Sequence, residues 1–88
     1  MLNVTRGQSI NWRLRFRDID ITGGIWTTVK TSLTGYSIAI TNATNGESRL
    51  TADGLDTATW AKGLKNLNLV LSLPGGDDFP VNLVIKVL

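Results

Sequence analysis

Hydrophobic and polar residues alternate along much of the chain, and the longest such run lies near its beginning. In INWRLRFRD, residues 10–18, the hydrophobic side chains have one parity and the arginines the other: Ile10, Trp12, Leu14 and Phe16 against Arg13, Arg15 and Arg17. Because successive side chains of a strand point to opposite faces, this period of two predicts a strand over residues 8–18. The hydrophobic set is expected to enter a core, and the arginines to point outward.

The rest of the chain predicts further strands separated by turns. DIDITGG predicts a turn in which Asp20 bonds to its own backbone and Gly23 and Gly24 tolerate positive φ. IWTTVKTS, LTGYSIAIT and ESRLTA predict strands, and Asn45-Gly46 is typical of the turn between antiparallel strands. LKNLNLVLSLPG and VNLVIKVL predict a final hairpin that is turned by PGGDDFP. The residues expected to point inward in these later strands are Tyr36, Ile38, Ile40, Leu67, Leu69, Leu71, Leu73, Val81, Leu83, Ile85 and Val87.

One segment departs from the strand pattern. In DGLDTATWAKG, Asp56 is suited to cap a single helical turn that runs through Trp60 to Lys62, and Gly63 is suited to end it in the left-handed conformation. Trp60 is expected to close an open end of the core. Regular strands and turns with almost no helix indicate one all-β domain, residues 1–88, with about six to seven strands and a short helical turn near residues 56–62. Such a pattern predicts an antiparallel β-sandwich or a small barrel.

Composition narrows the chemistry of this domain. The 88 residues include no cysteine and no histidine, which excludes disulfides, Cys/His metal sites, and thiol or imidazole catalysis. A chain of this length is near the lower limit for burying a sufficient core alone, so oligomerisation is expected. The opening MLNVTRGQS lacks the apolar region of a secretory signal, and no apolar run approaches the ~20 residues of a membrane helix. We expect a soluble product with no membrane partner, either intracellular or released from the cell by another route.

The positive charge lies mostly in the first half of the chain. The net charge is only +2, but residues 1–44 carry five basic groups against two acidic ones. Side chains on one face of a strand repeat every ~6.5 to 7 Å, so the arginine row matches the scale of phosphate spacing in a nucleic acid. Single-strand-binding sheets also place aromatic rings on the binding face, whereas Trp12 and Phe16 have the core parity. We therefore favour a solvated or protein-facing surface over nucleic acid as the role of the row.

The acidic residues and glycines predict no catalytic, cofactor or metal site. Asp77 and Asp78 lie at a predicted hairpin tip, which offers no cleft to shift a carboxyl pKa for acid–base chemistry. Asp53 and Asp56 lack the further oxygen ligands of a calcium loop, so turn and cap roles are favoured. Neither TGG nor PGG leads into a helix, as a phosphate-binding loop requires.

Two tryptophans outside the arginine strand are further candidates for binding. Exposed tryptophan can stack on sugar rings or anchor an interface. Trp26 shares its parity with the polar residues Thr28 and Lys30, so it is predicted as an outward residue at an interface.

Four segments occur in a characteristic order: TRGQSINWRLRF, LTGYSIAI, the capped turn LDTATWAKG, and the hairpin LNLVLSLPGGDDFPVNLVIKVL. This order resembles a recurrent small β-domain of tailed bacteriophages, similar to the amino-terminal domain of phage baseplate upper proteins, over residues 5–88. In one departure, the family runs almost directly from the first hairpin into Leu-Thr-Gly-Tyr, whereas here DITGGIWTTVKTS intervenes. This insertion, over residues 20–32, is a candidate contact arm.

The resemblance implies an immunoglobulin-like sandwich in a non-enzymatic virion protein that needs no cofactor. The expected role is an oligomeric connector or docking module of the tail, baseplate or head-tail region, assembled in the host cytoplasm with other virion proteins. The terminal strand would pair with a neighbouring subunit by strand addition. The alternatives are a capsid decoration or fibre-like module that binds host glycans through Trp26 or Trp60, and a small nucleic-acid-binding protein. The candidate interface residues are Arg13, Arg15, Arg17, Trp26, Lys30 and Leu88.

Overall fold

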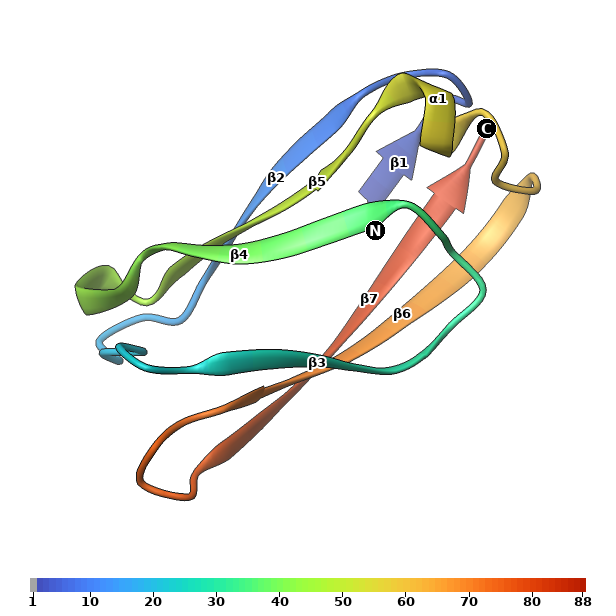
Figure 1. Ribbon diagram of the computed structural model, residues 1–88. Coiled ribbons are helices and arrows are strands. Elements are labelled where there is room, and N and C mark those ends of the chain that lie inside the picture. Colours follow the sequence, from blue (N-terminus) through green and yellow to red (C-terminus); the bar gives the residue numbers. More distant parts are fainter. Residues whose placement is uncertain (1) are drawn as a thin grey trace.

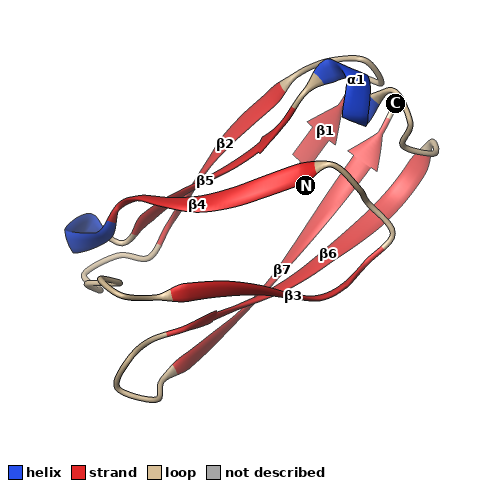
Figure 2. Ribbon diagram, viewed as in Figure 1, coloured by secondary structure: helices blue, strands red, loops and turns tan. Residues whose placement is uncertain are grey.

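Seven strands form two sheets that pack face to face (Figure 1), in a computed structural model that describes residues 2–88. The strands are β1 (Leu2–Val4), β2 (Ile10–Arg15), β3 (Ile25–Thr31), β4 (Tyr36–Asn42), β5 (Glu47–Ala52), β6 (Gly63–Ser72) and β7 (Asp78–Val87). Two short helical segments, η1 (Ala43–Asn45) and α1 (Gly54–Thr57), lie at opposite ends of the sandwich (Figure 2). The predicted all-β sandwich is confirmed.

The strand order is that of an immunoglobulin-like fold. One sheet has the order β1-β7-β6-β3 and the other the order β2-β5-β4. If the strands are lettered A to G along the chain, these sheets contain the C, F, G and the B, E, D strands of the immunoglobulin arrangement. The first strand differs, because β1 pairs with β7 in parallel, Leu2 beside Ile85, instead of joining the other sheet. No strand was predicted at residues 2–4, which are too short to show a period.

The core lies between the two sheets, where the predicted inward residues meet. Along β2, Ile10 is buried and Trp12 and Leu14 are half-buried, whereas Arg13 and Arg15 are exposed, which confirms the predicted facing. The opposite sheet contributes Leu67, Leu69, Leu71, Ile85 and Val87, all at most 2% exposed. The alternation predicted for the final hairpin is therefore confirmed.

The two predicted turns at the η1 end of the sandwich are present. Asp20 accepts a hydrogen bond from the Thr22 amide at 2.9 Å, and Gly23 has φ +77°. Gly24 does not adopt the positive φ that was expected of it. The β4–β5 turn uses Gly46 at φ +70° after the 3₁₀ turn, so the Asn-Gly prediction holds with a longer connection.

The helical turn begins earlier than predicted. It spans Gly54–Thr57, with Asp53 at the N-cap position and no side-chain cap hydrogen bond, and Gly63 already belongs to β6. The Thr57 hydroxyl fixes this position, because it donates to the Gln8 carbonyl at 2.8 Å and accepts from the Gly7 amide at 3.1 Å. The predicted cap at Asp56 is therefore wrong.

The predicted role of Trp60 is confirmed. Its side chain is 3% exposed and belongs to the core cluster, and its amide donates to the carbonyl of Thr57, the last residue of α1. The indole Nε1 donates to the Thr34 carbonyl at 2.8 Å.

Candidate interaction surfaces

The arginine row lies on the outer face of the three-stranded sheet. Arg13 and Arg15 are exposed on β2, and Arg17 is exposed in the turn that follows it. The register also places Arg49 of β5 directly beside Arg13, so the face carries a fourth arginine that the strand pattern of β2 did not indicate. Pairing between β2 and β5 depends on chain segments about 35 residues apart, which is why sequence periodicity missed it.

A carboxylate offsets part of this positive charge. Glu47 lies beside Arg15 in the register, and its Oε1 is 3.4 Å from the Arg49 Nε. The Arg49 side chain is 40% exposed, so solvent screens this ion pair and its contribution to stability is small. The outer face of β2 and β5 therefore remains predominantly basic, with Arg13 and Arg15 free of any salt bridge among the described residues.

Trp26 points inward, so the prediction that it is an outward interface residue is wrong. Its ring stacks on Phe16 with the centroids 6.0 Å apart, and it packs against the core cluster. The indole Nε1 donates at 2.9 Å to the Ser48 hydroxyl of the opposite sheet, and Ser48 is fully buried. The insertion over residues 20–32 supplies β3 of the sandwich rather than a projecting arm.

A β-bulge explains why the parity of this strand was misleading. The register of β3 with β6 shifts between Thr28 and Lys30, so that one extra residue, Val29, lies between them. Before the bulge Trp26 lies beside the inward Leu71, and after it Lys30 lies beside the outward Asn68. A bulge reverses the facing of the residues beyond it, so Trp26 and Lys30 lie on opposite faces despite their equal parity.

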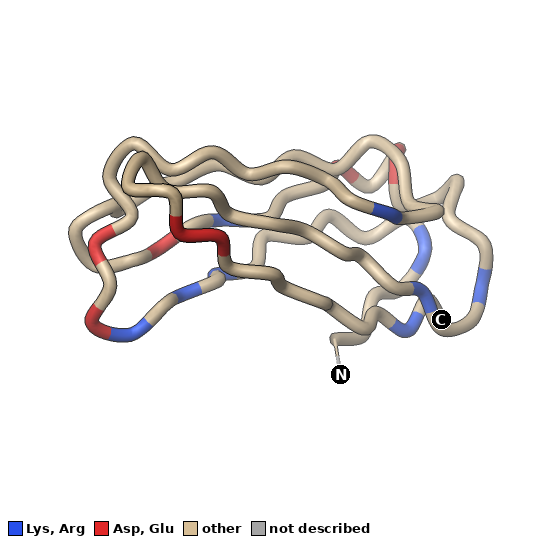
Figure 3. Tube along the Cα trace, turned by 90° about the horizontal axis from the view of Figure 1, so that it is seen from below, with Lys and Arg blue, Asp and Glu red and all other residues tan. Residues whose placement is uncertain are grey.

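The outer face of the four-stranded sheet is weakly charged and partly hydrophobic. Ile25 is 67% exposed, Leu64 61% and Val84 37%, and Val29 in the bulge is 63% exposed. Uncharged side chains fill most of the remaining outward positions: Asn3, Thr27, Asn66, Asn68, Val70, Ser72, Pro80 and Asn82. The charged residues lie mostly toward the two ends of the chain trace (Figure 3).

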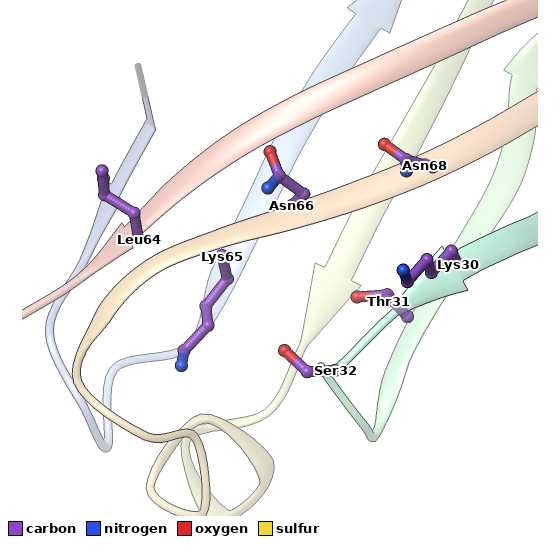
Figure 4. A pocket seen from close by; sticks show the side chains of 7 residues that line it. All are labelled: Lys30, Thr31, Ser32, Leu64, Lys65, Asn66 and Asn68. Carbon is purple, nitrogen blue, oxygen red and sulfur yellow. The ribbon is translucent and has the colours of Figure 1, made fainter.

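Lys30 borders an open groove at one side of this face. Side chains from the end of β3 and the start of β6 line a space of about 390 Å³ (Figure 4). Lys30 lies there beside Asn68, whose Oδ1 is buried without a hydrogen-bond partner among the described residues. The groove combines lysine, amide and hydroxyl groups with Leu64 and contains no carboxylate.

Leu88 does not lie on a free strand edge, so the strand addition predicted for the terminal strand is wrong at this end, where β1 pairs with Ile85 to Val87. β7 lies between β1 and β6, and the Leu88 amide donates to the Val4 carbonyl at 2.8 Å. The Leu88 side chain itself is 50% exposed. The backbone groups needed for augmentation at this position are already used within the chain.

The carboxylates are dispersed rather than gathered into a site. Asp77 is exposed in the turn between β6 and β7 and Asp78 is exposed at the start of β7. Among residues 2–88 no cluster of acidic side chains could hold a metal ion. The pKa of Asp20 is lowered below its ordinary value of 3.8 by hydrogen bonds from the hydroxyl and then the amide of Thr22. Asp20 lies in an exposed turn and not in a cleft, so its lowered pKa does not indicate a catalytic site.

Comparison with protein-family models, curated protein sequences and solved structures found no match to this chain. No helix among residues 2–88 has the length and apolarity needed to cross a membrane. The fold and its two outer faces are therefore the basis for a functional proposal.

Proposed function

We propose that this chain is a non-enzymatic structural protein of a tailed-bacteriophage virion that acts through protein–protein assembly. The observation that carries the proposal is the outer face of β1-β7-β6-β3, which exposes Ile25, Leu64 and Val84 with little charge. Leu64 and Val84 are diagonal neighbours across β6 and β7, and Ile25 lies at the other end of the face, beside Ser72. Contiguous exposed hydrophobic surface rimmed by polar residues marks interaction sites, and the uncharged residues between these positions make the face a candidate. The phage assignment itself depends on the resemblance in the order of sequence motifs.

The arrangement of charge on this face favours a second copy of the chain as its partner. Asp78 lies at one end of β7 beside Ser72, and Lys86 lies at the other end beside Leu64. A two-fold axis that lies in the plane of the interface and crosses the middle of β7 at right angles would bring Asp78 of each copy against Lys86 of the other. The uncharged and hydrophobic residues between these ends would then be buried.

The size of the face is adequate for such a dimer. The Cα trace extends 38 × 21 × 20 Å, so one broad face covers about 800 Å², which is the area each partner contributes to a typical stable interface. A small domain gains stability from association. In the proposed function, the dimer is the connector unit of a tail, baseplate or head-tail assembly.

The structure gives less support to the two alternatives. Glycan stacking was expected to use Trp26 or Trp60, and both indoles are packed against the core with their Nε1 groups bonded inside the protein. A nucleic-acid-binding face would combine basic and aromatic residues, whereas Trp12 and Phe16 lie on the inner side of the arginine strand.

Sedimentation velocity over a concentration series tests the proposal, with Ile25→Asp as the disrupting variant. Burial of a carboxylate in each half of the interface is expected to weaken dimerisation at least about tenfold. Leu55→Asp is the matched control, because Leu55 is 87% exposed on α1 and lies off this face, so its dimerisation should be unchanged.

A charge swap tests the two-fold arrangement specifically. Asp78→Lys should weaken dimerisation several-fold, and addition of Lys86→Asp should restore it. A monomeric wild type at all concentrations would refute self-association, and failure of the double variant to recover would refute the two-fold geometry. Immunolabelling of virions from the source of the chain tests the phage assignment separately.

A further inference from the structure

The outer edge of β2 is open to an additional strand. β2 is an end strand of β2-β5-β4, and its six residues keep an uninterrupted register with β5. No bulge and no proline occurs within Ile10–Arg15. The free N–H and C=O groups of such an edge can pair with another extended segment.

The other open edges in residues 2–88 carry features that oppose strand pairing. The end strand β1 has only three residues, and very short edge strands pair poorly. The register of β3 shifts at Thr28/Lys30 and that of β4 shifts at Ile40/Asn42. β7 extends beyond the three residues covered by β1, but this part contains Pro80, which has no N–H to donate. Bulges and prolines are the means by which sheets discourage edge pairing. β2 therefore differs from its counterparts in offering a long regular edge.

The backbone direction along β2 identifies the groups that face the open side. The Phe16 amide donates to the Gly46 carbonyl at 2.9 Å, so the backbone N–H of Phe16 points toward the β5 side of the strand. Since this direction alternates along a strand in an antiparallel pair, the N–H and C=O groups of Asn11, Arg13 and Arg15 point to the open edge. The arginine side chains flank these same groups on the outer face.

The side chains around this edge specify the chemistry of an incoming strand. Residues of the incoming strand that lie opposite Arg13 and Arg15 would point to the same outer face. Carboxylates at those positions of the incoming strand would therefore form cross-strand ion pairs with the two arginines. Arg49, one strand further in, adds positive charge. On the inner face, Trp12 and Leu14 are only half-buried, so a hydrophobic residue between the two carboxylates would cover them.

We propose that the β2 edge binds an extended segment of another protein in which acidic and hydrophobic residues alternate, adding it as a fourth strand to β2-β5-β4. A second copy of this chain is disfavoured there, because pairing β2 with itself would oppose the arginines. Residues 18–21, Asp-Ile-Asp-Ile, have the required pattern. This segment is not available to bind the β2 edge of another copy, because Ile21 is fully buried and its amide donates to the Ala43 carbonyl. The inference goes beyond the self-association proposed above, which uses the opposite sheet.

Amide hydrogen exchange measured by NMR with synthetic peptides tests the proposal. The probe is a peptide of alternating glutamate and valine, and the controls are a lysine–valine peptide and a glutamate–valine peptide of the same composition with its glutamates grouped together. The alternating acidic peptide should protect the amides of Asn11, Arg13 and Arg15. The two control peptides should bind at least about tenfold more weakly.

Variants of both partners separate strand addition from simple charge attraction. Arg13→Glu with Arg15→Glu should reverse the preference toward the lysine–valine peptide, whereas Lys62→Glu, an exposed change outside the arginine face, should leave it unaltered. N-methylation of the acidic peptide at alternate residues should abolish binding when it blocks the groups that face β2. The complementary set of methylations should leave binding intact, and this comparison leaves the protein unchanged.

The outcomes distinguish the possible occupants of the site. Protection at residues 11, 13 and 15, together with the reversed preference of the double variant, would support the proposal. Absence of this protection, or equal binding of the grouped-glutamate peptide, would overturn it. If a thymidine oligonucleotide bound more tightly than the alternating acidic peptide, with an affinity that fell steeply with salt, the arginines would be assigned to nucleic-acid binding instead. None of these results depends on whether the opposite sheet forms a dimer.

Discussion

Trp60→Ala is expected to destabilise this protein more than Trp12→Ala. Trp60 is 3% exposed and fills the end of the core, while Trp12 is half-buried on an edge strand. Truncation of a fully buried tryptophan costs about 3–5 kcal/mol. A domain of 88 residues has a total unfolding free energy of about 4–13 kcal/mol, so Trp60→Ala would remove a large part of it.

Trp60→Phe separates the packing of the ring from its hydrogen bond. The variant keeps most of the hydrophobic volume and loses the Nε1 donor to the Thr34 carbonyl. Since Thr34 is exposed, water can replace the donor, and the hydrogen-bond loss is expected to be about 1 kcal/mol. Trp12→Ala should fall below Trp60→Ala, at about 2 kcal/mol, because less of its ring leaves water on folding.

Urea unfolding monitored by far-ultraviolet circular dichroism measures these differences without relying on the fluorescence of the altered residue. The slope of free energy against urea should stay constant, so that shifts in midpoint report stability alone. Arg15→Ala is the surface control and should shift stability by less than about 0.5 kcal/mol. A loss of stability below about 1 kcal/mol for Trp60→Ala would contradict the assigned facing of the core. A loss for Arg15→Ala that exceeds the loss for Trp60→Ala would contradict it as well.

Two further predictions concern the turns. Asp20 should titrate below 3.8, and Thr22→Val should raise its pKa toward that value in a carbon-detected NMR titration; because the folded-state pKa is lowered, the stabilisation from ionised Asp20 is present above the unfolded pKa and is lost as pH falls through the folded one. An unchanged pKa in Thr22→Val would refute the assigned cause. Gly46→Ala should lower the melting temperature, because Gly46 has φ +70° and an added Cβ would lie 2.3 Å from the Phe16 carbonyl oxygen; the left-handed conformation alone costs about 1–2 kcal/mol. Gly75→Ala, with nothing within 4 Å of the added Cβ, is its control, and equal melting temperatures of the two variants would contradict this account.

The long regular strands could be predicted from the sequence because their alternation is uninterrupted. β2, β6 and β7 keep one parity from end to end, so the facing of Arg13 and Leu69 follows from any single residue of known orientation. β3 could not be predicted in the same way, because the extra residue Val29 reverses the facing between Trp26 and Lys30. Nothing in IWTTVKTS marks the position of that bulge.

The features of the candidate surfaces that were missed depend on contacts between distant segments. Arg49 joins the arginines through the pairing of β5 with β2, and β1 exists because Leu2 to Val4 find a partner in β7. Similarly, α1 begins at Gly54 because Thr57 bonds to the Gln8 carbonyl far back in the chain. Local periodicity and capping rules contain no information about such partners.

The parallel pairing of β1 with β7 determines how the domain responds to tension. Because Leu2 lies beside Ile85 and Val4 beside Val87, the two terminal strands run side by side in the same direction. A force that draws the two ends of the chain apart therefore slides these strands along each other, and their hydrogen bonds must break together rather than one at a time. The same force reaches the interior hairpins only after this terminal pair has given way.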